Sequence, residues 1–332
     1  MSKKTRYFVA TAAAILAVGL TTGLVASYMG LPVAFTSAAG PDELEYVPAD
    51  AAVVAYANVR EIMDSQFRER FRQFEPDTHE RDEFQQKTGV NIEQDIDSVV
   101  AAMIVDSTQT PTHSPKGMLI LARGRFDQAK LETLATEHGG KIEDYPTAGG
   151  VKRLITHTTD QGEAEMAIGF LEADLIAIGG YDAIKKSIDA KFGRNLVSVN
   201  GELMTQIAQI EGSNAWAVGR FDAIAGSAPI PSEVRSYLPA ITLFSAATHI
   251  NGGVSGVFKA ETRDEESAKN IRDIMSGFIA LAKMQADSHP ELRTMVDNLQ
   301  LTGEGKNIAV SFTVPSELFD ALQQLKQLEQ AR

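Results

Sequence analysis

Regular alternation of apolar and polar residues marks one strand near the C-terminus. Within residues 307–314 (NIAVSFTV), every second side chain is apolar and larger than its neighbours. The larger side chains are Ile308, Val310, Phe312 and Val314. A period of two places them on one face, which predicts an antiparallel strand with that face packed and the other toward water. This strand is the second arm of a hairpin predicted over 298–314.

Short apolar runs bounded by turn residues predict further strands throughout the chain. They lie at residues 51–59, 97–106, 117–124, 151–158, 163–171, 174–180, 214–221, 240–250 and 253–262. Two pairs of these runs form predicted hairpins, one around Glu172–Ala173 and one around the NGG at 251–253. Helices are predicted at 127–138, at 181–192, after residue 262 and from Ser316.

Two of the predicted helices carry a clear apolar stripe. After the first strand, Phe67, Phe71 and Phe74 fall at helical spacing before Pro76 ends the pattern. This phenylalanine stripe favours core packing, and a partner-docking face is the alternative. Farther along, Thr262 and Glu265 have the spacing of a capping box. The helix that follows carries its apolar residues at Ile271, Ile274, Phe278 and Leu281.

The order of predicted elements is similar in the two halves of the chain. Val53 and Ala55 correspond to Ala215 and Ala217, and the later elements follow in the same order apart from an extra hairpin at 163–180. Chance recurrence is the alternative to an internal duplication. The predicted fold is α+β, with two similar units of antiparallel sheet whose helices pack on one face. The units are predicted at 51–212 and 213–332.

The first fifty residues indicate export. Phe8–Met29 is a run of 22 residues without a charge, about 33 Å long as a helix. This length favours an uncleaved transmembrane anchor, and the small residues before Gly40 keep a cleaved signal as the alternative. Basic residues in 1–7 predict a cytoplasmic start and an exported body, with 30–50 as a tether. The predicted location is the inner (cytoplasmic) membrane, crossed once, with the body in the periplasm or extracellular space.

Three small residues lie four apart inside this apolar run. Gly19, Gly23 and Ser27 fall on one helical face, and such a stripe lets two membrane helices approach closely. A dimerising anchor is therefore one hypothesis. The alternative is the ordinary abundance of small residues in export segments.

Charge and cysteine content limit the classes of function. Without Lys3, Lys4 and Arg6 the chain has 28 basic and 44 acidic residues, a net charge of −16. Such a body repels nucleic acid, so no nucleic-acid partner is expected. There is no cysteine, which excludes disulfides, thiolate metal sites and a cysteine nucleophile.

No local motif indicates catalysis or a cofactor. The six histidines are scattered, and no two lie within ten residues of each other, so no local metal-binding pair is predicted. We therefore expect no catalytic, cofactor-binding or metal site from local sequence, although triads also assemble from distant residues. Trp216, the sole tryptophan, is expected in the core, with a ligand contact as the alternative.

Four segments carry a resemblance to a known group of proteins. They are YVPADAAVVAYANVREIM, RGRFDQAKLE, NAWAVGRFDAI and HINGGVSG. With them the chain resembles a family of bacterial exported proteins that have an N-terminal membrane segment and no assigned activity. The resemblance covers nearly the whole chain and implies export and an α+β body. It implies nothing about a substrate.

These observations favour a membrane-anchored extracytoplasmic protein that binds a partner or ligand. The membrane is its expected partner through the N-terminal helix, and the second partner is a protein or a small apolar molecule. Two alternatives stay open: a hydrolase with a site assembled between the units, and a carrier of an apolar ligand. The protein is more consistent with a non-enzyme.

We expect N-terminal sequencing of the mature protein to find the apolar run 8–29 retained, because its length matches a bilayer rather than a signal peptide. A mature chain that begins at Gly40 would show that the segment is a cleaved signal.

Overall fold

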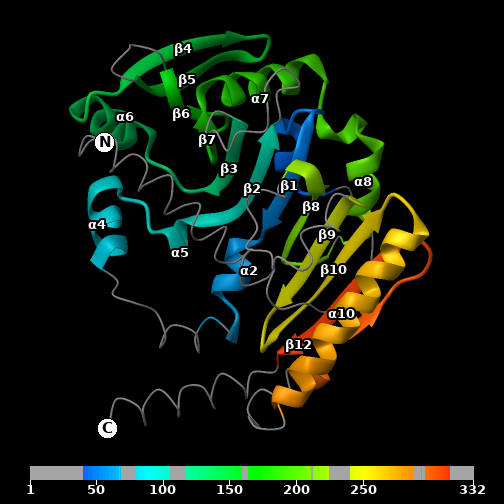
Figure 1. Cartoon of the computed structure of the whole chain (residues 1–332). Helices are drawn as coiled ribbons and strands as arrows, with labels where there is room; N and C mark the ends of the chain where they lie inside the picture. Colours follow the sequence, from blue (N-terminus) through cyan, green and yellow to red (C-terminus); the bar gives the residue numbers. More distant parts are fainter. Residues whose placement is uncertain are drawn as a thin grey trace, which may run out of the picture. The chain divides into compact units, whose positions relative to one another are not determined.

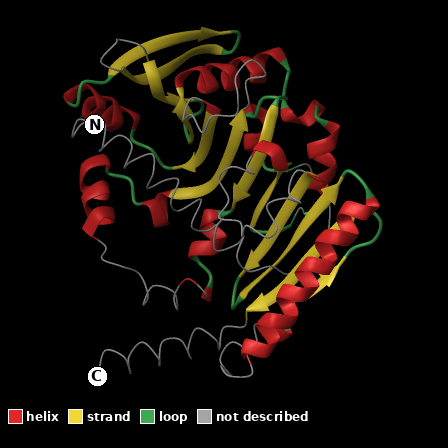
Figure 2. Cartoon of the chain, in the orientation of Figure 1, coloured by secondary structure: helices red, strands yellow, loops and turns green. Residues whose placement is uncertain are grey.

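The fold was analysed in a computed structural model. It describes residues 40–66, 68, 79–104, 117–158, 164–210, 212–223, 240–286, 293 and 296–314. Figure 2 shows the helices and strands of these segments, which form an α+β protein with antiparallel sheet pairing. The chain divides into two compact units. Unit 1 lies within Ala39–Arg60 and Asp77–Ala208, and unit 2 lies within Glu61–Pro76 and Gln209–Arg332. Unit 2 thus also takes residues that follow the first strand.

Unit 1 contains an antiparallel sheet with the strand order β1-β2-β3-β7-β6-β5-β4. Its strands are β1 (Ala51–Ala57), β2 (Ile96–Ile104), β3 (Met118–Gly124), β4 (Lys141–Thr147), β5 (Gly150–Thr158), β6 (Ala164–Phe170) and β7 (Leu175–Gly180). Its helices include α4 (His79–Thr88), α5 (Ile92–Asp95), α6 (Gln128–Glu137), α7 (Tyr181–Gly193) and α8 (Gly201–Ala208). The short helix α2 (Val59–Met63) follows β1. The hairpin predicted around Glu172–Ala173 is confirmed as β6–β7.

The strand β4 was missed by the sequence analysis. Its sequence KIEDYPT is polar and contains Pro146, and most of its residues are exposed or half-buried. Because β4 is an edge strand, neither of its faces has to be apolar, and the strand tolerates a proline. Proline and charged residues also hinder pairing with another chain, so β4 is a protected edge.

One face of the unit 1 sheet packs against α7 and the short helix η1 (Asp42–Tyr46). Figure 1 shows α6 and α7 on either side of β5 and β6. Eight apolar side chains on this face have no exposed surface. They are Val54, Val100, Leu119, Leu121, Leu154, Ala167, Leu175 and Ala177. This face is the core of unit 1.

The segment before β1 is part of this core. Leu44, Tyr46 and Val47 are buried, and the Val197 amide donates to the Val47 carbonyl at 2.8 Å. The Ser187 hydroxyl donates to the carbonyl of Tyr46. The prediction of a tether over 30–50 is therefore wrong for residues 41–50, whose apolar side chains are packed under α7.

A buried carboxylate fixes the same segment to the sheet. Glu43 is only 3% exposed, and its Oε1 accepts from the Ser98 hydroxyl at 2.8 Å and from Arg123 Nε at 2.7 Å. The other end of the Arg123 guanidinium donates to both carboxylate oxygens of Asp174 at 2.9 Å. Burial alone would lower the pKa of Arg123, but the bonds to Glu43 and Asp174 raise it, so the guanidinium stays charged.

A tyrosine extends this network. The Tyr46 hydroxyl donates to Glu172 Oε1 at 3.2 Å, and Glu172 also contacts Arg123. Desolvation, followed by the charge of Glu172, raises the pKa of Tyr46 above its ordinary value, so its hydroxyl remains a donor.

Unit 2 repeats the antiparallel pairing in the order β11-β12-β10-β9-β8. Its strands are β8 (Ala215–Arg220), β9 (Ile241–Ile250), β10 (Val254–Thr262), β11 (Gln300–Thr302) and β12 (Asn307–Val314). Both predicted hairpins, β9–β10 and β11–β12, are confirmed. Figure 1 shows the long helix α10 (Glu265–Ala286) running along β10 and β12. Ile308, Phe312 and Val314 are buried as the alternation predicts, and Val310 is half-buried.

The start of α10 differs from the predicted capping box. The Asp264 carboxylate accepts from the Ser267 amide at 2.7 Å and caps the helix, whereas the Thr262 hydroxyl donates to the backbone carbonyls of Asp264 and Lys306. The Ser267 amide lowers the pKa of Asp264. Of the predicted apolar face, Ile271 is buried, while Phe278 and Leu281 are exposed.

Replacement of Arg123 by methionine is expected to destabilise unit 1 by about 3–5 kcal/mol, because it leaves the Glu43 carboxylate buried and unpaired. Chemical denaturation followed by circular dichroism measures this change. The control is Arg125→Met, which removes a more exposed pair with Asp95 and should cost about 1 kcal/mol or less. Equal losses in the two variants would contradict a structural role for the buried pair.

Candidate functional site

The second face of the unit 1 sheet carries an apolar row that crosses every strand. Register pairs each member with the next across β1, β2, β3, β7, β6, β5 and β4. In that order the residues are Ala55, Ala101, Ile120, Ile178, Ile168, Ile155 and Ile142. Side chains on paired strands that share a register position point to the same face. With neighbouring strands about 4.8 Å apart, the row is about 29 Å long.

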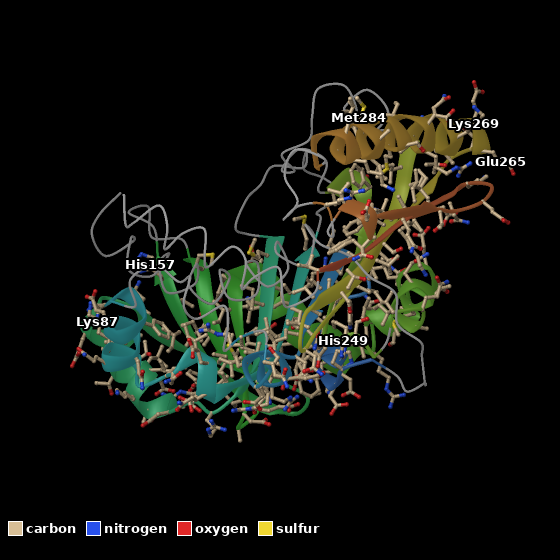
Figure 3. The ribbon with its side chains drawn as sticks, turned by 90° about the horizontal axis from the view of Figure 1, so that it is seen from below. Lys87, His157, His249, Glu265, Lys269 and Met284 are labelled. Carbon is tan, nitrogen blue, oxygen red and sulfur yellow. The ribbon has the colours of Figure 1, made fainter. Side chains whose placement is uncertain are left out.

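A second row lies two residues along the strands from the first. It contains Val53, Met103, Met118, Met166 and His157. Met103 pairs directly with Met118, and His157 pairs with Met166. We call these five residues the methionine row. Figure 3 labels His157, which ends the row on β5.

The two rows differ in exposure from the core face behind them. Ile120, Ile155 and Ile178 are buried, but Ala55, Ala101 and Ile168 are half-buried, and so is every member of the methionine row. Leu119, next to Met118 in sequence, has no exposed surface because it points toward α7. The same strands therefore present a closed apolar face on one side and a partly open one on the other.

The helix α6 limits this open face at one corner. Arg153 lies on the same face of β5, and its guanidinium donates to Glu132 of α6 at 3.1 Å. Four residues share the register position of Arg153 on the strands between β5 and β1, and all four are buried. They are Phe170, Ile176, Ala122 and Val99. Exposure thus rises from the α6 end of the strands toward the methionine row.

Such a face binds by removal of apolar surface from water rather than by hydrogen bonds. Methionine suits this task, because its unbranched, polarisable side chain adapts to differently shaped apolar partners. Among the described residues, Arg153 of β5 and Asp144 of β4 are charged side chains on this face, and both lie outside the two rows. The arrangement therefore fits an uncharged apolar group.

A second cluster of chemically active side chains lies on the α7 side of β4. The Tyr181 hydroxyl donates to both oxygens of Glu143 at 2.9 Å, and the Tyr145 hydroxyl donates to Asp189 at 2.9 Å. Lys185 Nζ lies 5.1 Å from the Tyr145 ring centre and 5.0 Å from that of Tyr181. The cluster thus holds a cation of the protein itself between two rings.

Both tyrosines of this cluster stay protonated at neutral pH. Desolvation, and then the carboxylate of Glu143, raises the pKa of Tyr181 to about 12. Desolvation and Asp189 raise the pKa of Tyr145. A tyrosine in this state donates a hydrogen bond and does not act as a base. The cluster joins β4 to α7 and supports the sheet behind the apolar face.

Most residues singled out in the sequence lie elsewhere. Trp216 is in β8 and only 6% exposed. The stripes Phe67, Phe71, Phe74 and Gly19, Gly23, Ser27 lie outside the described residues, as does the apolar run 8–29. In the part of the chain that the structure describes, no group of three or more histidines and acids is placed to hold a metal ion. Among the same residues, no helix has the length and apolar character needed to cross a membrane.

The sequence analysis did not single out the methionine row. Met103, Met118 and Met166 come from three strands, and they share a row only because β2 pairs with β3, β3 with β7 and β7 with β6 in a particular register. The available signal was that strands such as MLILARG and LIAIGG are apolar at consecutive positions, which predicts packing on both faces.

Comparisons with known proteins assign this chain to no family. No protein-family model matches the chain, and no curated protein matches it. A solved structure described as "Structure of crystal form I of TP0453" is similar over 85% of this chain and 96% of that chain. The sequence identity is 11% and the TM-score is 0.44.

Substitution of neighbouring residues distinguishes the two faces. We expect Leu119→Ala to lower the free energy of unfolding by about 2–5 kcal/mol, because Leu119 is fully buried. Met118→Ala should cost less, about 1 kcal/mol, since that side chain is only partly buried. Urea denaturation of the two variants measures the difference. A larger loss at Met118 than at Leu119 would mean that the second face is core.

Proposed function

We propose that this protein is a membrane-anchored extracytoplasmic binding protein whose unit 1 holds an apolar molecule against the methionine row and the adjoining isoleucine row. The observation that carries the proposal is the pair of rows in register, apolar except for His157, of which the methionine row is half-buried, on a sheet whose other face packs against α7 and η1. A membrane location gives such a protein access to apolar molecules.

The location rests on the N-terminal sequence. The uncharged run 8–29, preceded by Lys3, Lys4 and Arg6, fits a single helix in the inner membrane with the body on the outer side. Because residues 41–50 are packed into unit 1, the free segment between anchor and body is at most 30–40. At about 3.5 Å per residue, this segment holds unit 1 within roughly 40 Å of the bilayer.

The size of the face favours a small molecule over a protein. Two rows that lie about 7 Å apart along the strands and are about 29 Å long outline roughly 200 Å², and Ile120, Ile155 and Ile178 among them are already buried. A standard protein interface removes about 800 Å² from each partner, so these rows supply well under half of that area. A single extended acyl chain, by contrast, is long and narrow and matches the rows.

We further propose that the two units arose by internal duplication. The strand order in unit 2 is β8-β9-β10-β12-β11. When β4 and β5 are left out, the order in unit 1 is β1-β2-β3-β7-β6. In both units the first, second and third strands along the chain are followed in the sheet by the fifth and then the fourth. All these pairs are antiparallel. On this alignment the additional hairpin of unit 1 is β4–β5, at the edge, rather than the hairpin at 163–180.

Photoaffinity labelling tests the binding proposal. The full chain, reconstituted in phosphatidylcholine vesicles, is exposed to a diazirine analogue of palmitate, irradiated, digested and mapped by mass spectrometry. We expect labels on peptides from β2, β3 and β6. The triple variant Met103→Gln, Met118→Gln, Met166→Gln should lose labelling there at least fivefold, because polar side chains interrupt the apolar strip.

Met284→Gln, an exposed position on α10, is the matched control and should label as the unaltered chain does. Equal labelling of β2, β3 and β6 in the triple variant would contradict the proposed surface. Labelling of residues 8–29 reports separately on the anchor, because that segment is expected in lipid in every variant.

A further inference from the structure

Two polar atoms on one face of β9 in unit 2 are buried without a hydrogen-bond partner. They are the hydroxyl oxygen of Ser245 and Nδ1 of His249. Ser245 is only 2% exposed, and His249 is half-buried. Buried polar atoms are nearly always paired, and an unpaired one destabilises the fold unless a ligand completes it.

Both atoms lie on the face of β9 opposite α10. Positions 245, 247 and 249 share that face, whereas Phe244 and Thr248 share the other one. Phe244 stacks with Phe258 on the α10 side, and the Thr248 hydroxyl donates to the Ala215 carbonyl at 3.2 Å. The polar residues of β9 are thus satisfied on one face and unsatisfied on the other.

Strand register brings further groups to this unsatisfied face. Lys259 of β10 lies directly opposite Ser245, and Ser255 lies opposite His249. Between them, Ala247 pairs with Val257 on one side and with Trp216 on the other. Among the described residues, Lys259 is half-buried and takes part in none of the ion pairs. The face therefore has a hydroxyl and an ammonium group at one end, an apolar middle and an imidazole at the other end.

We propose that this face of unit 2 binds a small apolar carboxylic acid. The Ser245 hydroxyl and the Lys259 ammonium donate to the carboxylate, and the tail lies along the half-buried Val257, which is paired with Ala247. Ser245 and His249 are four residues apart on one strand, about 13 Å, which sets the length of the ligand. Figure 3 shows His249, which closes the far end.

This site is separate from the apolar face of unit 1. It lies on different strands, and it selects a charged head group that the methionine row has no means to recognise. The result of either test therefore does not decide the other proposal.

The chain contains a single tryptophan, so its fluorescence reports on this site in the whole protein. We use the full chain in phosphatidylcholine vesicles and titrate with octanoate, with octan-1-ol as the uncharged probe. A saturable change in Trp216 emission with octanoate, at least tenfold weaker with octan-1-ol, is expected. Lys259→Met should weaken octanoate binding at least tenfold, whereas the control Lys283→Met on α10 should not.

A second experiment measures the Tm of variants and needs no ligand. Ser245→Ala should raise Tm by about 2 °C or more, because it removes an unsatisfied hydroxyl, while Thr248→Val on the same strand should lower Tm, because it removes a satisfied one. Ser245→Ala should also weaken octanoate binding. Absence of a saturable change with octanoate, equal binding of octan-1-ol, unaltered affinity in Lys259→Met, or a lower Tm in Ser245→Ala would each overturn the proposal.

Discussion

The central strands of unit 1 are apolar on both faces, and this constraint governs the rest of the unit. A strand such as β3 places Leu119 and Leu121 on one face and Ile120 on the other, so both faces must be kept from water. The helices α7 and η1 pack on the first face and bury its central apolar side chains. On the second face the described elements leave the methionine row half-buried and the isoleucine row partly so, and α6 contacts the end near Arg153. The partly open apolar face follows from the strand composition itself.

A network of charged side chains also stabilises the first face of the sheet. Glu43 is buried between Ser98 and Arg123, and the guanidinium continues to Asp174. These bonds connect the segment before β1, the strands β2 and β3 and the β6–β7 hairpin. The segment before β1 is thus fixed to the sheet of unit 1.

The sequence predicted those elements whose signal is local, and it failed where tertiary packing decides. The alternation in β12 and the turns at Glu172–Ala173 and 251–253 identified hairpins, because one strand and its turn carry that signal. The strand β4 gave no such signal, since an edge strand buries neither face. Residues 41–50 resemble a linker in composition, and only their contacts with α7 show that they belong to the core. Asp264 displaced Thr262 as the cap because Thr262 is still within β10.

Neither candidate site was predictable, because both depend on register between strands far apart in sequence. Met103 and Met166 lie on one face only when β3 pairs with both β2 and β7, and Ser245 meets Lys259 only in the observed β9–β10 register. The central claim is that unit 1 carries an apolar molecule in the cell. Purification of the full chain from native membranes in mild detergent, followed by mass spectrometry of extracted small molecules, tests it most directly. The account predicts one apolar molecule in near-stoichiometric amount; a preparation that contains only a protein partner, or no bound molecule, would contradict it.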